Sequence, residues 1–157
     1  MELNPDFGDL LSAFDDRKVR FLLVGGYALS FYGRPRTTGD LDLWVEPTRR
    51  NAGRVLLALE DFGAPLVDLS LKDLVTPGLV FQIGVAPYRV DILTSLTGLR
   101  FEIAWRRRRR AHYGRIPISL LSESDFVKNK RALGRARDLA DAEEIASLLR
   151  KKRKRRS

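Results

Sequence analysis

Two short stretches decide the fold: Phe21-Leu-Leu-Val-Gly-Gly26 and Asp40-Leu-Asp-Leu-Trp-Val45. The first is a continuous apolar run that ends in two glycines, which is typical of a buried strand followed by a tight turn. The second alternates acidic and apolar residues with the period of two that a strand with two different faces requires. We therefore expect two strands, with the carboxylates of Asp40 and Asp42 on the same face of the second.

Carboxylates this close repel each other, and each raises the pKa of the other unless a cation lies between them. Hard cations such as Mg²⁺ bind carboxylate oxygens and retain open positions for phosphate and water. Asp91 lies in the apolar segment 89–93, where an unpaired charge is costly. These patterns predict a divalent metal site formed by Asp40, Asp42 and Asp91. The alternatives are solvated surface acids for the first two and a structural ion pair with Arg89 for the third.

Gly25 and Gly26 end the first strand and precede a segment of helical composition. Backbone amides at such a turn bind phosphate without the help of a side chain. A phosphate cradle that faces a carboxylate cluster suits in-line phosphoryl or nucleotidyl transfer, in which two metal ions stabilise the attacking and leaving oxygens.

Taken together, these motifs resemble the nucleotidyltransferase superfamily that includes DNA polymerase beta. Within it, the chain is most similar to the small bacterial nucleotidyltransferases, among them those of toxin–antitoxin pairs. The family pattern is a hydrophobic strand, Gly-Gly or Gly-Ser, Asp-x-Asp after a loop, and a third acid on a later strand. Here thirteen residues separate Gly26 from Asp40. The loop Arg36-Thr-Thr38 and the segment 128–141 also resemble this group, and the similarity extends over roughly residues 20–149.

The resemblance implies an enzyme that moves a nucleoside monophosphate from an NTP to a hydroxyl group and releases pyrophosphate. It implies two Mg²⁺ ions, with Mn²⁺ as an alternative, and the NTP as substrate. The catalytic and metal-binding residues that it implies are Asp40, Asp42 and Asp91, the last also helping to deprotonate the acceptor. The nucleotide-binding residues that it implies are Gly25, Gly26, Thr38 and Lys130. For Lys130 the alternative is a solvated helix face. Asp138 and Asp141 lie on one helical face, where they either orient Lys130 or Arg135 or, as we favour, form local structural contacts.

The positive charge is concentrated in two runs, Arg106–Arg110 and Arg150–Arg156, which hold 12 of the 29 lysines and arginines. The formal net charge is +9, so the rest of the chain is mildly acidic. Such runs attract polyanions. They favour RNA, such as a tRNA end, as the acceptor; a hydroxyl of a partner protein, as in a cognate toxin–antitoxin pair, remains open. We expect the first run to lie on a helix over 101–109, and residues 150–157 to be a disordered basic tail.

The composition excludes several other classes of function. The chain has no cysteine, which excludes disulfides, a thiol nucleophile and a cysteine zinc site. His112 is its single histidine, which excludes a multi-histidine metal site. The sequence has no apolar run of membrane-spanning length, and its start lacks the pattern of a signal peptide. We therefore expect a cytoplasmic protein with no membrane partner.

The fold class that these patterns predict is α/β (α+β), the nucleotidyltransferase fold. We expect a mixed sheet of about four or five strands, with helices mainly on one face, in a single domain of residues 1–149. Strands at 21–24, 41–45 and 89–93 are expected to be neighbours because the three acids have to converge. The segment Ile116-Pro-Ile118 is expected at an edge of the sheet, since proline has no N–H group to donate to the hydrogen bonds of a central strand.

A second hypothesis keeps this fold without turnover. The chain would then be a catalytically weak or inactive nucleotidyltransferase-fold protein that acts as an antitoxin or as a nucleic-acid-binding module. The presence of all three carboxylates favours the enzyme.

Overall fold

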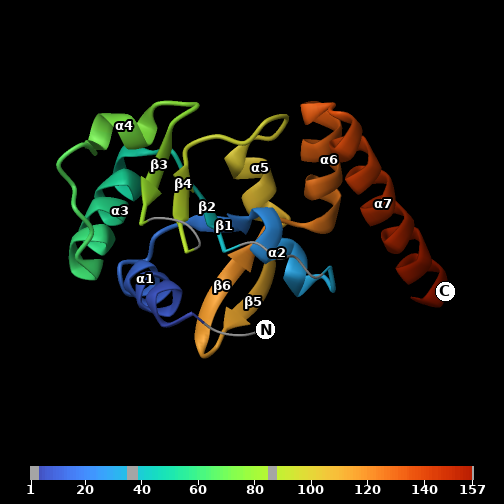
Figure 1. Cartoon of the computed structure of the whole chain (residues 1–157), viewed down its shortest axis with the longest axis horizontal. Helices are drawn as coiled ribbons and strands as arrows, with labels where there is room; N and C mark the ends of the chain where they lie inside the picture. The colour runs from blue at the N-terminus through green and yellow to red at the C-terminus, as the bar shows by residue number, and fades with distance from the viewer. Residues whose placement is uncertain (1–3, 35–38, 85–87, 157) are drawn as a thin grey trace.

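The apolar run Phe21–Val24 forms strand β1 inside a mixed sheet (Figure 1). The structure, a computed structural model, describes residues 4–34, 39–84 and 88–156. Over these ranges the sheet has six strands in the order β3-β4-β2-β1-β6-β5. The other strands are β2 (Leu41–Val45), β3 (Val80–Ile83), β4 (Val90–Leu93), β5 (Arg109–Tyr113) and β6 (Ile116–Leu120). The mixed α/β class is confirmed, but the strand count of four or five was too low.

The central strands are neighbours, as predicted. Strand β1 runs antiparallel to β2, with Val24 opposite Asp42, and β2 runs parallel to β4, with Asp42 opposite Asp91. Strands β3 and β4 form an antiparallel pair. The order β4-β2-β1 therefore brings the start of β2 and the start of β4 to the end of β1.

The additional strand comes from the arginine run, which does not lie on one helix. Helix α5 (Phe101–Arg106) ends within the run, and β5 begins at Arg109. At the end of the helix the guanidinium of Arg108 lies 4.0 Å from the ring centroid of Trp105 and its Nη1 donates a hydrogen bond of 2.9 Å to the carbonyl oxygen of Trp105. Pairing of β5 with β6 then favours an extended chain.

Strand β6 contains Pro117 and yet lies between two other strands, which contradicts the expected edge position. Its ladder with β1 is confined to Leu120, opposite Leu23, whereas its ladder with β5 includes Pro117. At the proline, β6 therefore has a ladder partner on one side, so the missing N–H interrupts no central ladder.

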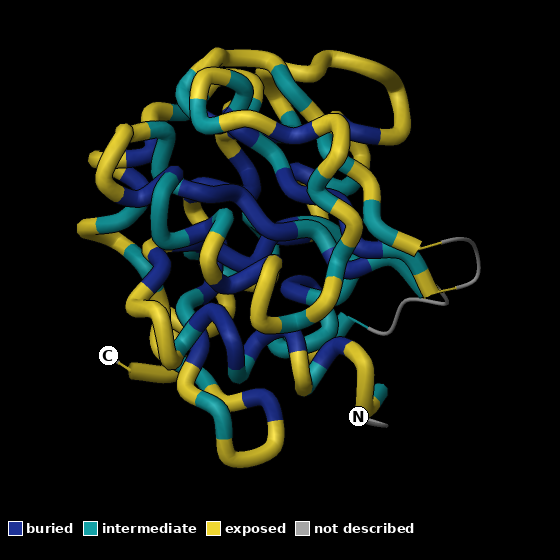
Figure 2. The backbone as a smooth tube through the Cα atoms, turned by 90° about the vertical axis from the view of Figure 1, so that its left-hand side faces the viewer, coloured by how far each residue is buried: buried dark blue, intermediate teal, exposed yellow. Residues whose placement is uncertain are grey.

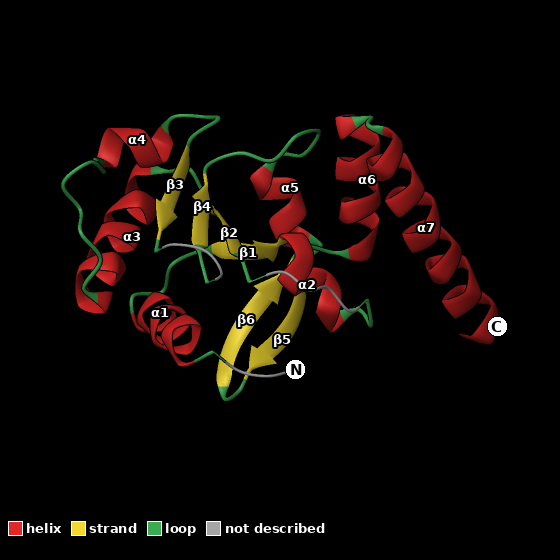
Figure 3. Ribbon diagram, in the orientation of Figure 1, coloured by secondary structure: helices red, strands yellow, loops and turns green. Residues whose placement is uncertain are grey.

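The described residues form seven helices, and they cover both faces of the sheet (Figure 3). Besides α5 they are α1 (Pro5–Asp16), α2 (Gly25–Phe31), α3 (Arg49–Phe62), α4 (Leu71–Val75), α6 (Glu123–Leu133) and α7 (Ala136–Arg156). Phe14 of α1 packs on Phe21 of β1, while Phe101 of α5 packs on Trp44, the ladder partner of Leu22. Adjacent residues of a strand point to opposite faces, so α1 and α5 lie on opposite sides of the sheet. At least one helix therefore packs on each face, and α3 lies beside α1.

The end of the chain is helical. Gly134 ends α6 in the left-handed conformation, and α7 then continues without a break through Arg150–Arg156, where a disordered tail was expected. Lysine and arginine are good helix formers, and cations at a helix C-terminus interact favourably with its dipole. Lys152 is also fixed by an ion pair with Glu123 of α6.

The central strands β1, β2 and β4 are mostly buried, whereas the edge strands β3 and β5 are largely exposed. Figure 2 shows the buried segments inside the molecule and the exposed ones around them. Buried aromatic side chains join the layers, among them Phe7, Phe14, Trp44 and Phe126. Over the described ranges, no helix combines the length and the apolar character needed to cross a bilayer.

Candidate functional site

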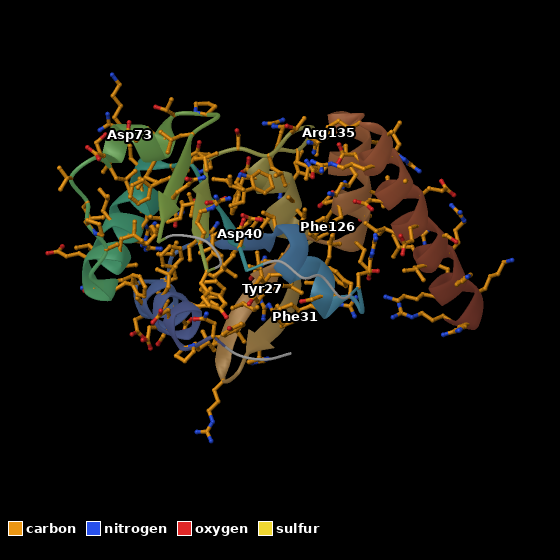
Figure 4. The ribbon with its side chains drawn as sticks, viewed as in Figure 1. Tyr27, Phe31, Asp40, Asp73, Phe126 and Arg135 are labelled. Carbon is orange, nitrogen blue, oxygen red and sulfur yellow. The ribbon has the colours of Figure 1, made fainter. Side chains whose placement is uncertain are left out.

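Three carboxylates meet where β1 ends. Asp40 directly precedes β2, and Asp42 lies two residues further along, so both point to the same face. Asp91 is the register partner of Asp42 on β4 and therefore shares this face. Figure 4 shows Asp40 near the centre of the molecule, beside α2. The convergence that the sequence predicted for these side chains follows from the strand register.

A cation already lies among these acids, and it is Arg89. The Nη2 atom of Arg89 is 3.0 Å from Oδ2 of Asp40, and its Nε atom is 3.1 Å from Oδ1 of Asp91. The Asp91 residue is 9% exposed, so without this partner its charge would be nearly buried and unpaired. The ion pair named above as the alternative for Asp91 is thus present, and it includes Asp40 as well.

The donor set suits a hard divalent cation, because it consists of carboxylate oxygens on one face. In the arrangement with Arg89 in place, however, no group of three or more acidic or histidine side chains in the described part of the chain is positioned to hold a metal ion. The guanidinium contacts two of the three carboxylates. Binding of Mg²⁺ by all three would therefore require Arg89 to turn away from Asp40 and Asp91.

Asp42 is accommodated because residue 25 has no side chain. Gly25 opens α2 with a φ of +74°, and a Cβ atom at this position would collide with Oδ2 of Asp42. Val24 is the N-cap residue of α2 and supplies no side-chain hydrogen bond to the first amides. Gly25 therefore serves two purposes, since it allows both the turn from β1 into α2 and the close approach of the carboxylate.

The environment of Asp42 disfavours its charge. Burial is the largest cause, followed by the charges of Asp91 and Asp40, and together they raise the pKa of Asp42 to about 6 despite the opposing effect of Arg89. Burial also raises the pKa of Asp91, against the lowering effect of Arg89. Arg89 therefore does not fully compensate the negative charge that the sheet brings together.

Lys130 belongs to a different cluster, between α6 and α7. Its Nζ atom lies 3.8 Å from Asp138 and 3.7 Å from Asp141, and Arg135 donates a hydrogen bond of 2.5 Å to Asp138. Figure 4 shows Arg135 at the turn between α6 and α7, apart from Asp40. Asp138 forms the expected local contact with Arg135, whereas the pairs of Asp138 and Asp141 with Lys130 join α7 to α6 and correspond to the alternative in which these acids orient Lys130. Thr38, the remaining predicted nucleotide ligand, lies outside the described residues.

Arg89 is the site residue that the sequence analysis did not assign to the site. Its signal was its position two residues before Asp91, on the same face of the same extended segment. Comparison of the sequence with protein-family models finds no matching family, and comparison with curated proteins finds no matching relative. The case for a function therefore rests on the residues and their geometry.

We predict that Gly25→Ala destabilises the protein more than Gly33→Ala does. Both glycines have positive φ, but a Cβ at Gly33 would meet no atom within 4 Å, so it is a matched control for backbone strain alone. That strain costs about 1–2 kcal/mol. Displacing the Asp42 carboxylate should add about 1–3 kcal/mol at position 25. Urea denaturation of both variants measures the difference, and equal losses would show that Asp42 moves aside without cost.

We also predict a pH-dependent gain in stability for Asp42→Asn in metal-free protein. The pKa of Asp42 in the folded state, about 6, exceeds its ordinary value, so the folded state binds more protons than the unfolded state between about pH 4 and 6. Proton binding therefore stabilises the folded wild type at low pH, and its free energy of unfolding falls as pH rises through that window. The variant, which cannot ionise there, should be more stable above it by on the order of 1–3 kcal/mol.

Thermal unfolding across this pH range with excess chelator measures the effect. Asp61→Asn is the matched control, because Arg17 lowers the pKa of Asp61 and its removal should act with the opposite sign. An Asp42→Asn variant that is less stable at every pH would show that Asp42 is a structural ion-pair member.

Proposed function

We propose that this protein is a metal-dependent nucleotidyltransferase, which moves a nucleoside monophosphate from an NTP to a hydroxyl of RNA, such as a tRNA end, or of a partner protein. The observation that carries the proposal is the placement of Asp42 between Gly25 and Asp91. It sets a crowded carboxylate group beside the glycine turn at the end of β1. The resemblance of these motifs to small nucleotidyltransferases supports the same function.

The crowding itself supports a cation-binding role. Repulsion and desolvation both oppose three carboxylates on one partly buried face, so the site favours a cation beside them. The raised pKa of Asp42 shows that the internal cation Arg89 relieves this only in part. A divalent ion would complete the compensation and leave coordination positions open for phosphate oxygens.

In the proposed reaction the acceptor oxygen attacks the α-phosphorus of the NTP. A new O–P bond forms, the bond from this phosphorus to the bridging oxygen breaks, and pyrophosphate leaves. Asp91 accepts the proton of the acceptor hydroxyl, and the backbone of Gly25 and Gly26 positions the phosphates. Two Mg²⁺ ions, or Mn²⁺, held by Asp40, Asp42 and Asp91 would supply stabilisation of the charge on the attacking and leaving oxygens.

The second candidate, a nucleotidyltransferase-fold protein without turnover, is favoured by one observation. Arg89 bonds to both Asp40 and Asp91, so the acids are already neutralised in part without a metal ion. Such a protein would act as an antitoxin or as a nucleic-acid-binding module. Transfer and binding assays separate the two functions.

We expect the protein to transfer label from α-³²P NTPs to RNA or to a partner protein in the presence of Mg²⁺. Asp42→Asn should reduce transfer at least about a hundredfold, because electrostatic stabilisation of the transferring group is the main catalytic effect. Asp61→Asn, a surface acid paired with Arg17, is the matched control and should retain full activity. Retention of label on the protein without transfer would support the binding module, and a fully active Asp42→Asn variant would remove the basis of the proposal.

We further expect Arg89 and the metal ion to compete for the acids. Replacing Arg89 with glutamine removes the internal cation, so Mn²⁺ should bind about tenfold more tightly, a change of ~1.4 kcal/mol. Isothermal titration of nucleotide-free protein with Mn²⁺ measures the affinity. Arg17→Gln removes the same charge from an exposed pair elsewhere and should leave the affinity unchanged. Weaker binding in Arg89→Gln would show that Arg89 orients the acids instead of occupying their site.

A further inference from the structure

The two basic runs, distant in sequence, lie side by side in the fold. Four basic side chains line one open hollow of about 360 Å³: Arg107, Arg108, Arg109 and Arg153. Four line a second hollow of about 230 Å³: Arg109, Lys152, Arg153 and Arg156. The hollows share Arg109 and Arg153, so they form one continuous surface, which we call the basic groove. Its walls are the segment between α5 and β5 and the last turns of α7.

A single acid joins the two walls. Glu123, the first residue of α6, is 9% exposed, and its Oε1 atom lies 3.1 Å from Nη1 of Arg109. Its Oε2 atom lies 3.1 Å from Nζ of Lys152. Because one nearly buried carboxylate holds a cation from each run, the two runs are fixed relative to each other. The groove therefore depends on the tertiary structure, because the contacts with Glu123 bring the two basic runs together.

The charges of the groove favour phosphate as the ligand. Six basic side chains line it, and the acids that pair with them are Glu123 and Asp125. Five of the six are arginines, whose planar forks bind phosphate oxygens in pairs. Lys152, Arg153 and Arg156 recur on α7 at the spacing of one helical face, which aligns their charges along the groove. An extended row of such groups fits a chain of phosphates better than one small anion.

The groove lies close to the carboxylate group, and α2 connects them. The helix begins at Gly25, against Asp42, and is followed by Tyr32, whose ring lies 5.4 Å from the guanidinium carbon of Arg109. At 1.5 Å per residue the helical segment between these two residues spans about 10 Å. A few nucleotides of an RNA strand are long enough to cover that distance.

We propose that the basic groove binds the phosphate backbone of an RNA strand whose end reaches the carboxylates as the acceptor. The acceptor role depends on the proposed function, whereas binding in the groove does not require turnover. An acidic partner protein is the competing occupant, and the binding experiment distinguishes it.

The experiment measures fluorescence anisotropy of a short labelled single-stranded RNA with the full chain, without NTP or metal ion, over a range of salt concentrations. Arg153→Gln/Arg156→Gln should weaken binding, and should reduce the slope of log K against log salt by about 1.4, the value for two lost phosphate contacts on a single strand. Arg109→Gln should reduce the same slope by about 0.7, although it lies in the other run.

The matched control is Arg131→Gln/Arg137→Gln, which removes the same charge from exposed positions near the turn between α6 and α7. This variant should bind RNA like the wild type. Equal weakening by the control and by the groove variants would overturn the proposal, because net charge alone would then explain binding. Displacement of the RNA by poly-glutamate at equal charge would also overturn it, in favour of an acidic protein.

The acceptor role has its own readout. In transfer assays with RNA, the groove variants should raise KM for RNA and leave kcat unchanged. Transfer with unchanged KM would refute the groove as the acceptor site while the proposed function stands. Groove-dependent RNA binding without any transfer would refute the proposed function while binding in the groove stands.

Discussion

Crowding of negative charge at the end of β1 is the constraint on which the rest of the site depends. The registers of β1, β2 and β4 bring Asp42 next to Asp91, and Asp40 follows because it shares a strand face. Gly25 provides the space for one carboxylate, and Arg89 provides positive charge for the other two. The pKa of Asp42, about 6, shows that the compensation is incomplete. Binding of a divalent ion, as proposed above, would complete this compensation.

The net charge of +9 conceals two regions of opposite sign. The acids lie at the middle of the sheet, whereas the basic groove lies between α7 and the segment before β5. Helix α2, which is about 10 Å long, has Asp42 against its first residue, and Tyr32, directly after it, contacts Arg109. Clustered charges attract polyanions at distances beyond direct contact. Substrates with phosphates would therefore be drawn to the groove before they touch it.

The helix pair α6–α7 has a supporting role in this arrangement. Lys130 bridges Asp138 and Asp141, and Asp141 also lies 3.5 Å from Nη2 of Arg34, just beyond α2. These ion pairs connect α7 to the segment that leads toward Asp40. The same helix carries, at its other end, the basic residues that complete the groove. One helix thus contacts the residues just after α2 and also lines the groove.

The sequence by itself determined the three central strands and the shared face of Asp40 and Asp42. These follow from local periods of two and from glycines whose role is local, so the pattern of neighbouring residues is sufficient. Only the tertiary structure decided that Arg89 pairs with two acids, that the arginine run enters β5, and that the last basic run is helical and lies beside it. Ion pairs and strand ladders between distant segments decide these features, and local sequence patterns do not encode which distant partner a charged side chain will meet.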